Sequence, residues 1–139
     1  MQRIRETETE RSRGKTAVRT YRDLNVYDQS FELAMEIHKL TNGFPVEERY
    51  SLTDQMRRAA VSLTSNIAES FSRRSSKEKS RFYDIAQASL IELQNQLIIS
   101  KDVNYLSNND FEPINEQLVI CNKLLAGLLR ATKDKKFEN

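Results

Sequence analysis

Five polar side chains recur at helical spacing between residues 55 and 69, where the chemistry open to them is hydrogen bonding and ion pairing. They follow one another at intervals of 3, 4, 4 and 3 residues: Gln55, Arg58, Ser62, Asn66 and Glu69. A parallel apolar stripe consists of Met56, Ala60, Leu63 and Ile67. At about 100° per residue, the polar stripe lies beside the apolar one. Polar groups at the edge of a core need hydrogen-bond partners.

The charged members of this stripe cannot pair with each other. Arg58 and Glu69 are about 16 Å apart along one helix axis, so we expect partners from a later helix, with Ser89 and Glu92 as candidates, or from another subunit. The stripe is then a network that fixes helix register or a subunit interface; the alternatives are solvent exposure and a ligand site. We expect Arg58→Ala to change oligomeric state or stability more than Arg57→Ala.

A second group of residues could bind phosphate. Residues 73–81 contain one acidic residue, Glu78, and five basic residues: Arg73, Arg74, Lys77, Lys79 and Arg81. Nearby serine hydroxyls and the free N–H groups of the following helix add donors for an anion. Aromatic residues for base stacking are few, so nucleic-acid binding here would be driven by the backbone and weakly sequence-specific. The alternative is a solvated loop.

Catalytic chemistry is nearly absent from the sequence. His38 is the single histidine, and Cys121 lies on an apolar stripe, where a cysteine is ordinarily an inert small hydrophobe. We find no phosphate-binding glycine loop, no nucleophile elbow and no Glu-x-x-His pair of a di-iron bundle. The sequence therefore predicts a protein that is not an enzyme and needs no metal or cofactor.

Length and composition indicate one helical domain. The chain has 139 residues with only 3 glycines and 2 prolines, which disfavours a fold rich in β-turns. It has no apolar run of membrane-spanning length, and a single cysteine excludes an internal disulfide framework. Because the segment from Arg3 to Arg13 is charged, we expect no secretory signal there. We expect a soluble cytoplasmic protein with no membrane partner.

Residues 1–20 lack apolar periodicity and are predicted to be a disordered basic tail, followed by a bundle at 21–139. Residues 1–22 contain seven basic and three acidic side chains, a net charge of +4, which leaves −2 for residues 23–139. The tail is a candidate nucleic-acid arm, although its glutamates weaken this interpretation. The bundle itself is not basic overall.

Four helices are expected to position these groups. The first runs from Leu24 to Thr41 with Tyr27, Phe31, Ala34, Met35, Ile37 or His38, and Leu40 inward, and ends where Gly43 adopts a left-handed conformation. The second starts between Val46 and Leu52, with Ser51 and Asp54 as a cap, and continues to about Phe71.

The third helix, from Ser76 to Val103, starts with a Ser75–Glu78 capping box. We expect Phe82, Ile85, Ala86, Ser89, Leu93, Gln96 or Leu97, and Ser100 to face inward. Ile91, Ile98 and Ile99 fall off that face and suggest an interface. Asp110 caps the fourth helix, which has Pro113 in its first turn and frays after Arg130. Its apolar stripe is Phe111, Ile114, Leu118, Cys121, Leu125 and Leu128. Short links between the helices predict an all-α, antiparallel up-down-up-down bundle.

The chain resembles the four-helix-bundle family of 23S rRNA intervening-sequence proteins. The resemblance covers about residues 21–131 and depends on four segments, of which NIAE at residues 66–69 is the most specific: DLNVYDQSFELAMEIHKLT, FPVEE, QMRRAAVSLTSNIAES and ASLIELQNQL. The family usually has Gly where this chain has Ser70, and often Trp where it has Tyr27.

The resemblance implies a ring-shaped homo-oligomer, with five bundles as the expected number. Many members are encoded inside intervening sequences of 23S rRNA genes, and their biochemical role is poorly defined. The fold is more distantly similar to the accessory variability protein of diversity-generating retroelements, which binds nucleic acid and a reverse transcriptase. Because that relative is markedly basic and this bundle is not, the resemblance supports oligomerisation more than nucleic-acid binding.

Together these observations predict a non-enzymatic oligomeric scaffold that associates with RNA or a ribonucleoprotein through basic loops at one end. The alternative is a pure protein-interaction oligomer that contacts no nucleic acid. The two differ in salt dependence, because phosphate contacts weaken steeply as salt rises.

Overall fold

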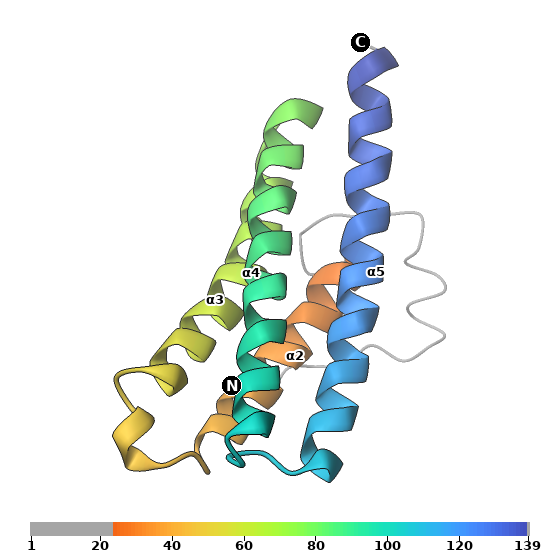
Figure 1. The fold of residues 1–139 in the computed structure, drawn as a ribbon. Helices are drawn as coiled ribbons and strands as arrows, with labels where there is room; N and C mark the ends of the chain where they lie inside the picture. The colour runs from red at the N-terminus through yellow and green to blue at the C-terminus, as the bar shows by residue number, and fades with distance from the viewer. Residues whose placement is uncertain (1–23, 139) are drawn as a thin grey trace, which may run out of the picture.

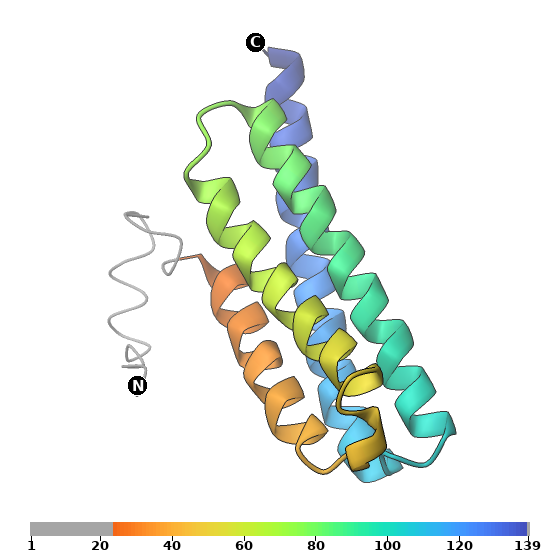
Figure 2. The ribbon, with the colours of Figure 1, turned by 90° about the vertical axis from the view of Figure 1, so that its left-hand side faces the viewer.

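The computed structural model describes residues 24–138, which form four antiparallel α-helices and no strand. The helices are α2 (Asn25–Thr41), α3 (Leu52–Phe71), α4 (Ser76–Asp102) and α5 (Asn108–Glu138), with a short 3₁₀ helix, η2 (Val46–Glu48), before α3. Figures 1 and 2 show that the α3–α4 turn and the end of α5 share one end of the bundle, whereas both other links lie at the opposite end. The up-down-up-down prediction is confirmed, and the predicted tail at 1–20 lies outside the described residues.

The core face of α2 is confirmed at Ala34 and Ile37 and differs from the predicted one elsewhere. The helix buries Val26, Ser30, Leu33, Ala34, Ile37 and Thr41. Tyr27, Phe31 and Leu40 are only half-buried, and Met35 is 52% exposed. The residues that are buried and those that were predicted to be buried both lie at helical spacing on α2. Periodicity alone therefore could not show which of the two groups faces the core. The predicted stop also differs: Gly43 does not adopt a positive φ, and among the described residues only Asn104 does so outside glycine (φ 66°).

Glu48 rather than Ser51 caps α3. The Leu52 N–H donates to Glu48 Oε2 at 3.3 Å, and the Ser51 hydroxyl donates to the same oxygen at 2.6 Å instead of accepting from the helix. The Tyr105 hydroxyl donates to Glu48 Oε1 at 3.0 Å. The hydrogen bonds from Ser51 and then Tyr105 lower the pKa of the Glu48 carboxyl, and the bond to Glu48 raises the pKa of Tyr105. Glu48 thus ties the α2–α3 link to the α4–α5 link.

The start of α4 follows the prediction, because the Glu78 N–H donates to Ser75 Oγ at 3.1 Å. Most of its inward positions are confirmed: Ala86, Ser89, Leu93, Gln96, Leu97 and Ser100 are buried. Phe82 is only half-buried, and Ile85 is 40% exposed and was wrongly placed in the core. Tyr83 and Leu90 are buried instead.

The start of α5 lies earlier than predicted and its end later. Ser107 is the cap, accepting from the Asp110 N–H at 3.2 Å, so Asp110 lies within the first turn and Pro113 inside the helix. The apolar stripe is confirmed as far as Leu125. Leu129 then replaces Leu128, which is half-buried. The helix continues to Glu138 instead of fraying after Arg130.

Candidate functional site

The predicted basic residues gather at the α3–α4 turn, but they are not equivalent. The Arg73 guanidinium bonds to Glu69, one turn earlier on α3, and lies 4.7 Å from the centre of the Phe82 ring. Lys79 Nζ lies 5.8 Å from the centre of the Phe71 ring. These two cations therefore stabilise the turn, because each packs over an aromatic ring that would otherwise be more exposed to water.

The other three cations face solvent without a partner. Arg74, Lys77 and Arg81 are exposed, and within residues 24–138 none of them makes an ion pair or hydrogen bond. Lys77 and Arg81 are four residues apart and so share one face of α4. Their charges are available to an anion at the N-terminus of a long helix, where the helix dipole also favours negative charge.

The serine hydroxyls of the turn are already used. Ser72 Oγ donates to the Glu69 carbonyl at 2.8 Å, and Ser75 Oγ accepts the capping bond of α4. Tyr83 is buried, and Phe71 and Phe82 are half-covered by the cations above. A nucleic acid would therefore meet side-chain cations here, without serine donors or an open ring for base stacking.

The opposite end of the bundle has the opposite charge. The two links and the first turns of α5 carry five carboxylates: Glu47, Glu48, Asp102, Asp110 and Glu112. Four cations lie at the same end: Arg49 and Lys101 in these segments, Lys39 in the last turn of α2, and Arg57, which bonds to the end of α2. The excess of negative charge at this end is therefore small. A polyanion meets one favourable end and one weakly unfavourable end.

The middle of the polar stripe joins α3 to α4. Ser89 Oγ donates to Ser62 Oγ at 2.8 Å across the two helices. Asn66 Nδ2 donates to the Ser62 carbonyl at 2.7 Å and to Ser62 Oγ at 3.2 Å. Three of the predicted residues thus form a small network between helices, which accounts for part of the stripe.

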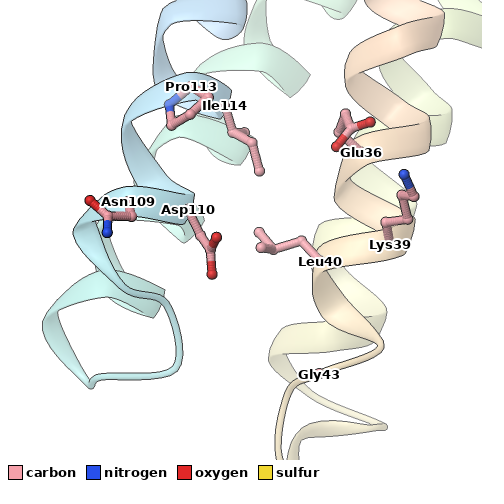
Figure 3. A pocket seen from close by; sticks show the side chains of 8 residues that line it. All are labelled: Glu36, Lys39, Leu40, Gly43, Asn109, Asp110, Pro113 and Ile114. Atoms are coloured by element: carbon pink, nitrogen blue, oxygen red, sulfur yellow. The ribbon is translucent and has the colours of Figure 1, made fainter.

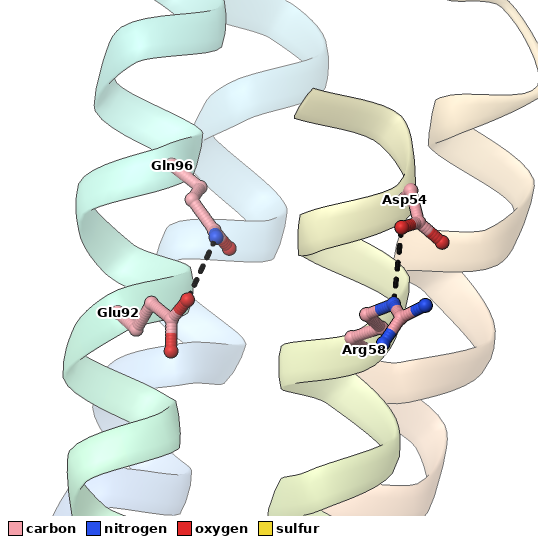
Figure 4. A network of polar contacts seen from close by, with 4 residues as sticks. All are labelled: Asp54, Arg58, Glu92 and Gln96. Carbon is pink, nitrogen blue, oxygen red and sulfur yellow. Dashed lines mark hydrogen bonds and ion pairs between the residues drawn. The ribbon is translucent and has the colours of Figure 1, made fainter. Parts of the chain in front are cut away.

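The ends of the stripe bond within their own segments. Arg58 pairs with Asp54 at 3.0 Å, and Gln96 donates to Glu92 at 3.3 Å (Figure 4), while Glu69 pairs with Arg73. Gln55 is exposed. The expectation that Arg58 and Glu69 need partners from another helix or subunit is therefore corrected: each has a partner one turn away.

Arg57, which belongs to neither stripe of the sequence, makes more extensive contacts than Arg58. Its Nε donates to Thr41 Oγ1 at 2.9 Å, and one terminal nitrogen donates to Asn42 Oδ1 at 2.8 Å and to the His38 carbonyl at 3.4 Å. These acceptors are all at the end of α2. Arg57 therefore binds the negative end of one helix from the side of the next.

The outer face of α4 carries exposed apolar side chains in the pattern predicted. Ile91 is 59% exposed, and Ile98, Ile99 and Ile85 lie between 40% and 44%. On the neighbouring helix α5, Val119 and Ile120 are also exposed. These residues lie on the outside of two adjacent helices, where a single chain leaves them in water.

An open pocket of about 490 Å³ lies between the end of α2 and the start of α5 (Figure 3). Leu40, Pro113 and Ile114 supply its apolar surface, and Glu36 and Asp110 place carboxylates on opposite sides. Sequence analysis did not identify this pocket. Its two walls, which end at Gly43 and begin again at Asn109, are far apart in the chain, and neither wall has a distinctive motif.

Other candidate reactive groups are buried or isolated. Cys121 is fully buried, and burial raises the pKa of its thiol to about 11. His38 Nδ1 lies 3.1 Å from the Ala34 carbonyl in its own helix. Within the described part of the chain, no three His, Cys, Asp or Glu side chains group as metal ligands would. None of the described helices is long and apolar enough to cross a bilayer.

Comparison with known proteins identifies the family but no activity. A crystal structure of a protein of unknown function from the S23 ribosomal protein family of Bacteroides thetaiotaomicron is 25% identical, with a TM-score of 0.70 over 76% of this chain and 95% of that chain. No curated protein matches. The family profile of the 23S rRNA-intervening sequence protein matches residues 22–127. The chain therefore belongs to the 23S rRNA-intervening sequence protein family.

Proposed function

We propose that the protein is a non-enzymatic scaffold that binds the phosphate backbone of RNA, alone or in a ribonucleoprotein, through the α3–α4 turn. The observation that carries the proposal is the set of three unpaired cations at that turn: Arg74, Lys77 and Arg81. The names of the matching families refer to 23S rRNA and to the ribosome, and they support an RNA partner. Because the turn offers charge without base-stacking groups, recognition depends on phosphate density and not on sequence.

A charge-removal variant tests the RNA proposal. Arg74→Gln, Lys77→Gln and Arg81→Gln together are expected to weaken binding of a labelled structured RNA and to lower the slope of log affinity against log salt by about 2 to 3, since each phosphate contact contributes about 0.7 to 0.9. Fluorescence anisotropy at several salt concentrations measures both quantities.

The matched control removes three exposed cations elsewhere: Lys39→Gln, Arg49→Gln and Lys123→Gln. It changes the net charge by the same amount and is expected to keep most of the salt slope. If both triple variants lose affinity equally, the turn is not the binding site. If the unaltered protein binds no RNA even at low salt, the proposal fails and the protein-interaction scaffold becomes the better reading.

We also propose that copies of the chain associate through the outer face of α4 into a ring-shaped homo-oligomer, with five subunits expected from the family resemblance. The exposed isoleucines of α4 support this, because apolar patches on adjacent helices commonly mark protein interfaces. A ring would repeat the α3–α4 turn in every subunit and so multiply its contacts with a long polyanion.

Ile91→Lys tests the assembly, because it places a charge in the proposed interface without touching the core. Light scattering coupled to size-exclusion chromatography is expected to show monomers. Val61→Lys is the control, since Val61 is 52% exposed on α3 and lies away from the isoleucines. An unchanged mass for Ile91→Lys, or equal dissociation of both variants, would exclude this face as the interface.

A further inference from the structure

The pocket between α2 and α5 has the chemistry of a site for a basic side chain. Glu36 and Asp110 face it from different helices, and neither makes an ion pair or hydrogen bond through its carboxylate within residues 24–138 (Figure 3). Leu40 and Ile114 point into the space between them. Arg and Lys have an apolar stem and a charged head, so they match an apolar surface flanked by carboxylates.

Pro113 adds an acceptor beside the pocket. A proline inside a helix has no N–H, so the carbonyl four residues earlier, here that of Asn109, lacks its α-helical donor. Both residues line the pocket. Lys39, which also lines it, is the one cation among the lining residues and leaves the local carboxylates in excess.

A line of acidic residues connects this pocket with the place where the described chain begins. Asp28, Glu32 and Glu36 follow one another at four-residue intervals on α2, and residues at that spacing share one helix face. Their charge is opposite to that of residues 1–22, which contain Arg3, Arg5, Arg11, Arg13, Lys15, Arg19 and Arg22.

The length of that segment is sufficient. About 22 Å separate Asn25 from Leu40 at 1.5 Å per helical residue. An extended chain covers this distance in about seven residues at about 3.3 Å each. A segment that runs back along α2 from residue 23 therefore brings the region of Arg13 and Lys15 to the pocket.

We propose that the groove between α2 and α5, with its pocket at Glu36 and Asp110, is the docking surface for the basic N-terminal segment of the same chain. The carboxylates of α2 guide the segment, and one of its cations fills the pocket between Glu36 and Asp110. This docking does not depend on whether the α3–α4 turn binds RNA.

The composition of the chain allows a direct proximity test. The protein has no tryptophan and one cysteine, and that cysteine is buried with its thiol pKa raised to about 11. A bimane dye can therefore be attached selectively to Thr16→Cys, and Asn109→Trp at the edge of the pocket serves as the quencher in the full-length protein. We expect quenching at low salt and its loss at 1 M salt, where the Debye length is about 3 Å.

Three comparisons make the result decisive. Glu36→Lys with Asp110→Lys should abolish the quenching, whereas Glu47→Lys with Glu112→Lys, two exposed carboxylates outside the pocket, should preserve it. Lys123→Trp, in place of Asn109→Trp, should not quench the dye. Mixing dye-only with tryptophan-only protein should give no quenching. Quenching in that mixture as well would assign the groove to the segment of a second copy. The proposal would be overturned by quenching in the mixture or by the absence of quenching at low salt. It would also be overturned if the quenching persisted in the variant with Glu36→Lys and Asp110→Lys.

Discussion

Leu125→Ala is expected to lower the free energy of unfolding by about 2–5 kcal/mol, the range for a large-to-small change in a packed core. Leu125 has no exposed surface and lies near the middle of α5. The helices around it are long and packed on several sides, so they cannot collapse into the space that the substitution leaves. Urea denaturation at fixed protein concentration measures the change as a shift of midpoint at constant slope.

A neighbouring pair tests the register of the same helix. Leu129 is 6% exposed and Leu128 is half-buried, so Leu129→Ala should cost more stability than Leu128→Ala. The reverse order would mean that α5 is rotated relative to the described packing. A loss below about 0.5 kcal/mol for Leu125→Ala, the level of ordinary surface changes, would contradict its place in the core.

Arg57→Ala is expected to cost about 1–3 kcal/mol, because hydrogen bonds to charged groups contribute more than neutral ones and three acceptors lose their donor together. Thr41, which is 3% exposed, loses a partner that water cannot easily replace. Urea denaturation again measures the change in the free energy of unfolding. Arg57→Lys should lose less stability than Arg57→Ala but more than none, because a single ammonium group cannot donate to all three acceptors as the planar guanidinium does.

Arg58→Ala is the matched control, one residue away. Its side chain is 79% exposed and pairs with Asp54 within the same helix, an arrangement that contributes about 0.3–0.5 kcal/mol. The contacts within one chain thus give the opposite order to the one expected from the polar stripe. Equal effects of the two substitutions would refute the bridging role of Arg57.

Periodicity predicts what repeats along one helix and fails where two helices meet. The α5 stripe as far as Leu125 and the Ser75 cap were correctly predicted, because each depends on residues close in sequence. On α2, Ala34 and Ile37 were predicted correctly, whereas Tyr27, Phe31 and Leu40 were misassigned because they lie at helical spacing just as the buried residues do. Arg57 and the pocket at Glu36 and Asp110 could not be predicted, because each is formed by segments that only the tertiary structure brings together.

At the α3–α4 turn, too, the sequence predicted which residues lie near one another but not the contacts that they make. Its five predicted cations lie close together, but Arg73 and Lys79 pack over aromatic rings, which only the folded turn reveals. Similarly, Ser62, Asn66 and Ser89 were predicted as members of a polar network. Ser89 bonds to Ser62 across the two helices, whereas Asn66, Arg58 and Glu92 bond within their own helices. The spacing of residues shows which of them share a helix face, but it does not show which hydrogen-bond or ion-pair partner each residue has.

The unlike ends of the bundle make the molecule an electric dipole. A dipole in the field of a polyanion experiences a torque before contact, so the α3–α4 turn would lead the approach. Such steering raises the association rate constant and leaves the dissociation rate largely to short-range contacts. It fades as added salt shortens the Debye length to about 8 Å at physiological ionic strength, well below the length of α4. The orientation in which the bundle arrives is thus determined by charges that need not touch the partner.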